Sequence, residues 1–263
     1  MPVTPFQKGV LRLLAANRSP ESHVAGAIVL NQAGDSPRYS QDIDVNHDLE
    51  EAVARSAERD SAILTANGYT VEWAMREPMF TRAMIRRGED WVKLEWVFDS
   101  AFRFFPAEPD PECGWRLNFY DAATNKVLAL VGRVMARDFV DIIHIHRRQL
   151  SFGALCWAAS GKDAGLNPFF ILGEARRTTH YTKGDFEAVQ LTQPLDLPAL
   201  YQTWRQALAE AETLLGKLPA EEVGCLYLNE QNVSVTPDPA SPDFPKLRRH
   251  FGSVRGAWPV IRE

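Results

Sequence analysis

The chain has 263 residues, of which 45% are hydrophobic and 24% are charged, and its formal net charge is −5. This is the composition of an ordinary globular protein. A mildly acidic chain is not a general nucleic-acid-binding protein, because contacts with a phosphate backbone need Lys and Arg gathered on one face. The longest apolar runs are far shorter than the roughly 20 residues that span a bilayer, and no signal peptide is predicted at the N-terminus.

The cysteines point to a reducing compartment. Cys113, Cys156 and Cys225 are odd in number, far apart, and lack the spacing of a zinc site. Neither a disulfide framework nor a structural metal site is therefore expected. We interpret the three residues as reduced thiols in a cytoplasmic protein.

The first half of the chain is predicted to mix helices and strands. Thr4 and Pro5 have the residue types that begin a helix, and a short amphipathic segment follows them. The next elements expected are an apolar segment over 24–30, a turn-rich loop over 31–40, a strand over 42–45, a helix over 48–67 ending at Gly68, and strands over 69–75, 80–86, 91–98 and 115–119.

The second half is predicted to be helical. Helices are expected over 122–131, 133–146, 151–160, 168–177 and 197–215, the last capped by Asp196. Gly132 either separates the first two or marks close packing within one long helix. The tail from Thr236 is expected to be irregular and packed through Phe251 and Trp258. The order of elements indicates an α+β protein, with a mixed-sheet domain over 1–120 and a mainly helical domain over 121–263.

Asp42 and Asp44 form the first candidate for chemistry. Alternate residues of a strand share a face, so both carboxylates are expected to project the same way. Two close carboxylates repel each other unless a cation lies between them. Magnesium suits such a pair because it prefers oxygen ligands and shares its remaining positions with water and substrate phosphates. An Asp-x-Asp pair also occurs by chance on many surfaces, so the pair alone does not establish a metal site.

Glu95 is a candidate third acid. The predicted strand over 91–98 places Lys93 and Glu95 on one face, whereas its other face is apolar. A carboxylate on a partly buried strand needs a partner. If this strand lies beside the Asp42 strand, Glu95 completes a cluster of three carboxylates that could bind two metal ions. The alternative is that Glu95 pairs with Lys93 or with a neighbouring arginine.

A basic row follows in the predicted helical half. On one continuous helix, Lys126 and Arg133 lie two turns apart on nearly the same face, and Arg137 follows one turn later. Such a row has the residue types that hold a triphosphate. Asp141 lies four residues after Arg137 and is placed to orient it. The alternative is a solvated helix with internal salt bridges.

These motifs together resemble the AbiEii/AbiGii-type nucleotidyltransferases of bacterial abortive-infection and toxin–antitoxin systems. The resemblance is carried by Gly26, by Ser-x-Asp-Ile-Asp at 40–44, by Lys-Leu-Glu at 93–95, and by K-x-x-A-L-x-x-R-x-x-x-R-D-x-x-D at 126–141. It implies a DNA polymerase β-like fold followed by a helical domain. It also implies magnesium-dependent transfer of a nucleoside monophosphate from a nucleoside triphosphate, with two metal ions bound.

The resemblance also implies roles for individual residues. Asp42, Asp44 and Glu95 would hold the metal ions and, with Lys126, form the catalytic set. The residues expected at the nucleotide are Gly26, Ser40, Lys126, Arg133, Arg137, Asp138 and Asp141. The chain departs from the family at two places: Ala27 stands where relatives carry a hydroxyl residue, and Glu95 stands where many have Asp.

Three functions remain open from the sequence. The first is a toxin that modifies RNA, with tRNA as one candidate, or a protein side chain, and that has a cognate antitoxin as its expected partner. The second is a catalytically weak relative that binds nucleotide or a partner. The third is a small-molecule nucleotidyltransferase of the antibiotic-modifying kind. An RNA acceptor would need a basic surface. The candidate clusters for that surface are Arg147-Arg148, Arg176-Arg177 with Lys183, and 246–249. Each cluster is also consistent with ordinary solvated charge.

Overall fold

The computed structural model describes residues 3–31 and 35–259, which divide into two compact units. The first unit comprises the chain up to Ala122 together with Val254–Gly256, and the second comprises Ala123–Ser253 and the chain from Ala257. Residues 32–34, within the turn-rich loop predicted over 31–40, lie outside the described residues. Among the described residues, none of the helices combines the length and hydropathy needed to cross a membrane.

The first unit is built on a seven-stranded mixed sheet in the order β3-β4-β5-β2-β1-β8-β7. β2 pairs with β5 in parallel and β1 with β8 in parallel, whereas the other neighbours are antiparallel. The strands of this sheet are β1 (Ser22–Ala25), β2 (Asp42–His47), β3 (Thr70–Glu77), β4 (Phe80–Arg87), β5 (Asp90–Phe98), β7 (Glu108–Asp110) and β8 (Gly114–Arg116).

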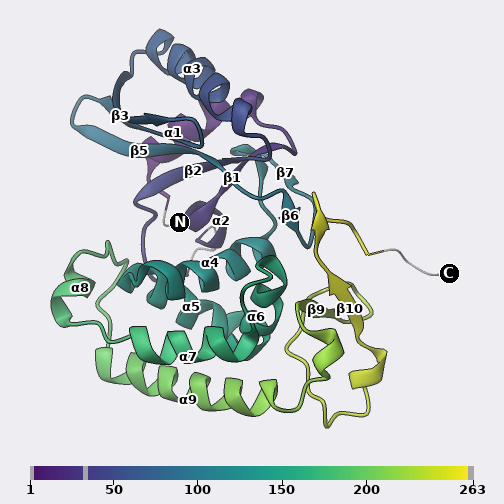
Figure 1. Ribbon diagram of the computed structural model, residues 1–263. Coiled ribbons are helices and arrows are strands. Elements are labelled where there is room, and N and C mark those ends of the chain that lie inside the picture. The colour runs from purple at the N-terminus through teal and green to yellow at the C-terminus, as the bar shows by residue number, and fades with distance from the viewer. Residues whose placement is uncertain (1–2, 32–34, 260–263) are drawn as a thin grey trace. The chain divides into compact units, whose positions relative to one another are not determined.

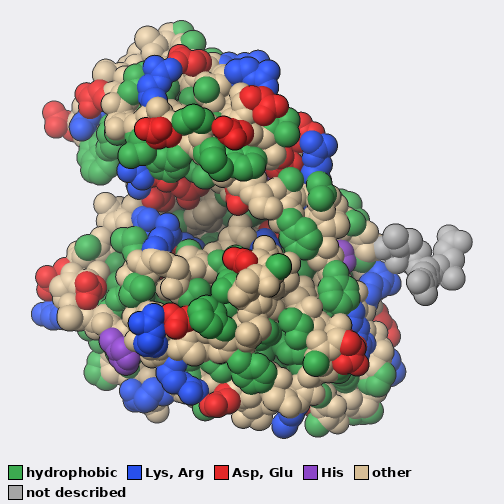
Figure 2. Space-filling view, viewed as in Figure 1, with side chains coloured by type: hydrophobic (Ala, Val, Ile, Leu, Met, Phe, Trp, Pro, Cys, Tyr) green, Lys and Arg blue, Asp and Glu red, His purple; other side chains and the backbone are tan. Residues whose placement is uncertain are grey.

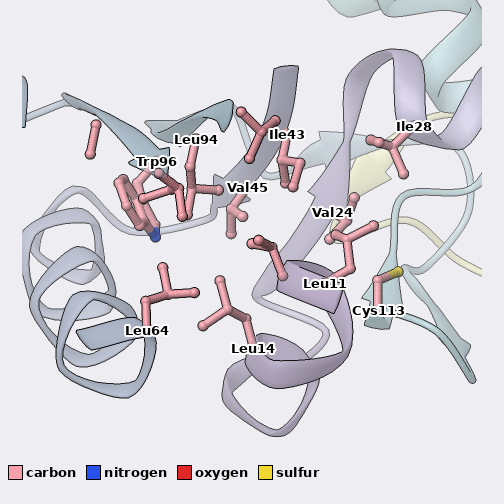
Figure 3. Close-up of a cluster of buried hydrophobic side chains, with 14 of the residues drawn as sticks. Leu11, Leu14, Val24, Ile28, Ile43, Val45, Leu64, Leu94, Trp96 and Cys113 are labelled. Atoms are coloured by element: carbon pink, nitrogen blue, oxygen red, sulfur yellow. The ribbon is translucent and has the colours of Figure 1, made fainter. Parts of the chain in front are cut away.

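One face of this sheet is covered by the helices α1 (Pro5–Leu14) and α3 (Glu50–Ala66), as Figure 1 shows. Thr4 and Gln7 close a capping box at the start of α1, as the Thr4-Pro5 pair predicted. Alternate residues of β2 and β5 meet leucines of both helices in the hydrophobic core shown in Figure 3. The opposite face of β2 and β5 therefore carries the polar residues, and the candidate site lies there.

The predicted elements of the first unit are found with small shifts. The helix expected over 48–67 is α3, and Gly68 follows it with a φ of +78° in the left-handed region. The apolar segment over 24–30 becomes the end of β1 and the short helix α2 (Gly26–Leu30). Further elements of this part of the chain are a 3-10 turn η1 (Ala15–Asn17) and β6 (Phe102–Arg103), which pairs with β11 (Ser253–Val254).

The second unit is mainly helical. Its central helix, α6, is buried at all eight of its residues, and Gly153 in it lets α9 approach, because a Cβ there would lie 2.9 Å from the Cα of Ala211. The helices are α4 (Phe119–Arg133), α5 (Ala136–Arg148), α6 (Phe152–Ala159), α7 (Pro168–Thr178), α8 (Lys183–Glu187) and α9 (Leu197–Leu215), with short 3-10 turns η2 (Ser160–Lys162), η3 (Ala220–Glu222) and η4 (Phe244–Lys246).

Two predictions for the second half were wrong. Gly132 neither breaks a helix nor packs closely, because α4 continues through it and a Cβ there would meet nothing within 4 Å. The chain instead breaks at Val134, which has a φ of +50°. In the tail, Phe251 and Trp258 are 49% and 55% exposed, so neither side chain is buried against the body as expected. It contains the strand β10 (Arg248–Phe251), which pairs with β9 (Cys225–Leu228).

Candidate functional site

The register of the sheet gathers the acidic residues predicted from the sequence. Asp44 is the direct neighbour of Glu95 on the adjacent parallel strand, and Asp42 is the neighbour of Lys93. Cross-strand neighbours project from the same face of a sheet. Arg82 on β4 lies opposite Glu95 and extends the row. Residues more than 50 positions apart in the chain are thus brought to one place by strand pairing.

The three carboxylates form a compact cluster. One oxygen from each of Asp42, Asp44 and Glu95 can be chosen so that all three lie within 4.8 Å of one another. Asp42 is 4% exposed and Glu95 is 9% exposed, whereas Asp44 is half-buried. Burial of several carboxylates is costly unless positive charge compensates them. The donor set fits a hard divalent cation such as magnesium, which takes carboxylate oxygens as ligands.

Two basic side chains already compensate part of this negative charge. The Lys93 ammonium lies 3.1 Å from Oδ2 of Asp42 and 3.0 Å from Oε1 of Glu95. Arg82 donates from Nε to Oε1 of Glu95 at 2.8 Å. The two alternatives considered for Glu95 are therefore both present, because it joins the acidic cluster and also pairs with Lys93 and an arginine. The ammonium marks a position where a cation is favoured.

Gly26 lies directly against Asp44. Its φ is +63°, and a Cβ at this position would lie 1.9 Å from Oδ2 of Asp44. Any side chain here would collide with the carboxylate and would also strain the backbone. Gly26 was predicted to contact nucleotide; in the structure it provides the space that Asp44 occupies.

Ser40 and Gln7 hold the start of β2. Ser40 is 1% exposed, and its hydroxyl donates to the carbonyl of Asp42 at 2.8 Å. The carbonyl of Ser40 accepts from Nε2 of Gln7 at 2.8 Å. Ser40, predicted at the nucleotide, thus fixes the backbone of a metal-ligand candidate. Gln7 was missed, because the sequence analysis singled out only Thr4 and Pro5 at the start of this helix.

A second charged cluster lies in the helical unit. Lys126 of α4 is 6% exposed, and its ammonium lies 2.8 Å from Oδ1 of Asp138 and 3.2 Å from Oδ2 of Asp141. Arg133 donates to both carboxylate oxygens of Asp138, from Nε at 2.7 Å and from Nη2 at 2.9 Å. Arg137 is the second residue of α5 and is partly buried.

Of the two alternatives left open for this segment, two separate helices are found rather than one continuous helix, yet the motif comes together. α4 ends at Arg133 and α5 begins at Ala136, so the three basic residues do not form one helical row. The break turns the chain so that Asp138 in the first turn of α5 faces two basic residues of α4. Asp141, expected to orient Arg137, lies within ion-pair distance of Lys126.

The surroundings of Asp138 keep it ionised. The carboxylate is fully buried, and burial alone would raise its pKa. The hydrogen bonds from Arg133 and the charge of Lys126 outweigh that effect and lower the pKa of Asp138 to about 2. The Asp138 carboxylate therefore remains charged at neutral pH.

The candidate basic clusters for an acceptor are largely paired with acids or neutral groups. Arg176 and Arg177 pair with Glu212 and Glu174, and Lys246 pairs with Asp243. On the face shown in Figure 2, basic and acidic side chains are interspersed over the surface. These contacts favour the interpretation of these clusters as ordinary solvated charge.

Comparisons with known proteins agree with the geometry. The sequence matches the family "Nucleotidyl transferase AbiEii toxin, Type IV TA system" over residues 12–223. The fold is similar to MenT4, the nucleotidyltransferase toxin Rv2826c from Mycobacterium tuberculosis H37Rv, with a TM-score of 0.55 and 17% identity over 82% of this chain and 83% of that one.

Two Helicobacter pylori structures are also similar. JHP933 has a TM-score of 0.52 at 16% identity, covering 80% of this chain and 90% of its own. A putative nucleotidyltransferase has a TM-score of 0.50 at 16% identity, covering 80% and 94%. A search of curated proteins returned no match. At these identities the structural likeness establishes the nucleotidyltransferase fold.

Proposed function

This chain belongs to the AbiEii family of nucleotidyltransferase toxins, and from that premise we propose that it transfers a nucleoside monophosphate from a nucleoside triphosphate to an RNA or protein acceptor, with magnesium held by Asp42, Asp44 and Glu95. The observation that carries the proposal is the cluster of three carboxylates on adjacent strands. Three carboxylates from adjacent strands, each with an oxygen within 4.8 Å of the others, offer the oxygen ligands that a divalent cation prefers.

Several residues of the sheet would each have a role at the metal site. Bound magnesium, proposed as two ions, would neutralise the triphosphate and polarise the reacting oxygens. Asp42, Asp44 and Glu95 would supply the ligands. Gly26 would leave room for Asp44, and Ser40 would fix the backbone of Asp42. Arg82 would orient Glu95 through the hydrogen bond from its Nε.

The charged cluster of the helical unit would bind phosphate groups of the nucleotide. We assign Lys126, Arg133 and Arg137 to that role, with Asp138 and Asp141 as the residues that hold Lys126 and Arg133 in position. The Arg133 side chain is 46% exposed, so its guanidinium is accessible to solvent while it is bound to Asp138. A phosphate group could then accept hydrogen bonds from the same guanidinium.

Membership of the family supports a proposal for the biological role. A type IV toxin–antitoxin system pairs a toxin with a cognate antitoxin, and we propose that this chain is the toxin partner. Its acceptor would be RNA, with tRNA as one candidate, or a protein side chain in the cytoplasm. A second candidate function is a catalytically weak relative that binds nucleotide, because Lys93 already contacts two of the three carboxylates.

The decisive experiment is transfer of label from each α-labelled nucleoside triphosphate to total RNA and protein, with magnesium, by the wild type and by Asp44→Asn. Loss of an outer-shell residue of a metal site costs about 10–100-fold, so loss of a direct ligand should cost at least about 100-fold. Asp90→Asn is the matched control, since it lies at the exposed start of β5, outside the cluster.

Three outcomes are informative. Label that enters RNA or protein with the wild type and Asp90→Asn, and not with Asp44→Asn, supports the enzyme and identifies its donor and acceptor class. Equal transfer by Asp44→Asn would refute the proposed site. Magnesium-dependent nucleotide binding without transfer would support the catalytically weak relative instead.

A further inference from the structure

A second polar pocket lies within the first unit, on the other face of the sheet. Its cavity has a volume of about 390 Å³. Its walls come from η1 and the turn after it, from the paired strands β1 and β2, and from one side of α3. The lining residues that matter are Arg18, Ser22, His47, Arg55, Ser56 and Arg59. His47 is three residues beyond Asp44 on β2, so by strand alternation it faces away from the carboxylates.

The floor of this pocket holds buried polar atoms without partners. His47 is fully buried, and neither of its ring nitrogens has a hydrogen-bond partner among the residues that the structure describes. The hydroxyl of Ser22, which lies opposite His47 in the register of β1 and β2, is also buried and without a partner there. Buried polar groups are nearly always satisfied in native proteins, because leaving one unsatisfied is costly. Ser22 and His47 both line the cavity, so these unsatisfied donors and acceptors border one space, which indicates a ligand.

Arg18 contributes unused donors to the same floor. Its Nη2 is bound to Asp60, with an ion-pair distance of 2.6 Å, and its side chain is 1% exposed. Its Nε and Nη1 have no hydrogen-bond partner in the described part of the chain. The guanidinium is thus oriented by one carboxylate and retains two further nitrogens for another acceptor.

The rim of the pocket is positively charged. Arg55 and Arg59 lie one turn apart on α3 and are exposed. None of the described residues lining the cavity is acidic. Because Asp60 balances Arg18, the two rim arginines leave the pocket with a net positive charge. Burial and the nearby Arg18 lower the pKa of His47 to about 3, so its imidazole is neutral and offers one donor and one acceptor.

We propose that this pocket binds the phosphate group of a small phosphorylated molecule, at a site separate from the catalytic carboxylates. A tetrahedral phosphate accepts hydrogen bonds from arginine forks, hydroxyls and an imidazole N–H, which are the groups gathered here. The cavity falls within the range of roughly 300–1,000 Å³ typical of small-molecule sites, so it has room for more than an inorganic ion. The inference does not rest on the proposed transfer reaction.

The test is calorimetric titration with inorganic phosphate, with adenosine monophosphate and with adenosine, in a chelator that removes divalent metal. We expect saturable binding of one phosphate or one monophosphate per chain, with adenosine much weaker. Asp44→Asn should bind with unchanged affinity, because the catalytic carboxylates lie on the other face of the sheet. A higher affinity for the monophosphate than for phosphate would identify an organic phosphate as the ligand class, and the reverse would identify the free ion.

Variants at the rim locate the site. Charge-assisted hydrogen bonds contribute enough for Arg55→Ala and Arg59→Ala each to weaken binding about tenfold. Both residues are exposed, so the variants should fold, which circular dichroism verifies. Arg86→Ala is the matched control, since it removes an exposed arginine from β4 of the same unit. Absence of saturable binding by the wild type would overturn the proposal. So would equal affinities in the wild type and both rim variants, or equal binding of adenosine.

Discussion

The two charged clusters of this protein differ in how their members are brought together and in how their charge is balanced. In the sheet, Asp44 and Glu95 are far apart in the chain and meet through the pairing of β2 with β5. In the helical unit, Lys126, Arg133 and Asp138 lie within one short stretch and meet through a turn between α4 and α5. Strand register therefore builds the first cluster, whereas local chain geometry builds the second.

The two clusters also differ in which acidic and basic side chains are in contact. In the sheet cluster, Lys93 and Arg82 contact Asp42 and Glu95, whereas in the helical cluster, Lys126 and Arg133 contact Asp138 and Asp141. Removing one member of a buried cluster of ion pairs leaves an uncompensated charge. Three carboxylates gathered within 4.8 Å of one another favour a divalent cation among them. The comparison implies that variants of the helical cluster act mainly on stability, and variants of the sheet cluster mainly on metal binding.

The largest expected effect is on stability, at the fully buried Asp138. Asp138→Asn removes the carboxylate that accepts from Lys126 and Arg133, and breaking a buried pair costs about 3–5 kcal/mol. Chemical denaturation followed by circular dichroism measures the loss. Asp243→Asn is the matched control, because its pair with Lys246 is exposed and should contribute under about 1 kcal/mol.

The pH dependence of this difference tests its cause. The pKa of Asp138 falls from 3.8 in the unfolded chain to about 2 in the folded protein. A carboxylate with a lowered pKa adds stability that is present above pH 4 and is lost as the pH falls towards 2. The stability gap between the wild type and Asp138→Asn should therefore narrow over that interval. A gap that stays constant down to pH 2 would show that ionisation of Asp138 is not responsible.

The next effect, on metal binding, is expected from Gly26→Ala. The new Cβ would lie 1.9 Å from Oδ2 of Asp44 and would displace that carboxylate, so magnesium affinity and transfer should fall about 100-fold. Gly88→Ala is a close control, because Gly88 has a φ of +61° and its Cβ would meet nothing within 4 Å. Both variants carry the backbone strain of about 1–2 kcal/mol for a side chain in the left-handed region. Equal metal affinity in the two variants would remove Gly26 from the site.

The sequence predicted those features of the site that depend on residues close together in the chain. Strand alternation placed Asp42 and Asp44 on one face, and the short motif from Lys126 to Asp141 predicted a charged cluster. The pairing of β2 with β5 could only be posed as a condition, because a parallel pair depends on a long crossover connection. The close contact of Gly26 with Asp44 depends on the same tertiary arrangement.

The wrong predictions have a common physical origin. Each was based on the conformational preference of a residue type, which the tertiary fold overrides. Glycine is the usual residue for a left-handed conformation, and a break at Gly132 was one of the two alternatives, yet the β-branched Val134 adopts that conformation with a φ of +50°. The Pro-rich tail suggested irregular chain held by aromatic residues, yet Arg248–Phe251 pairs with β9 through backbone hydrogen bonds. Neither arrangement leaves a periodic pattern in the sequence.

The smallest expected effect concerns the cation already present in the acidic cluster, and it tests directly how the charge of that cluster is compensated. Lys93→Met keeps most of the aliphatic stem and removes the ammonium that contacts Asp42 and Glu95. A metal ion would then no longer compete with that charge, so magnesium affinity should rise about tenfold, while stability without metal should fall. Calorimetric titration with magnesium measures the first change and thermal unfolding in chelator the second, with Lys8→Met on α1 as the control. A fall in affinity would mean that Lys93 supports the bound state, and the competition inferred between its ammonium and the metal ion would then be wrong.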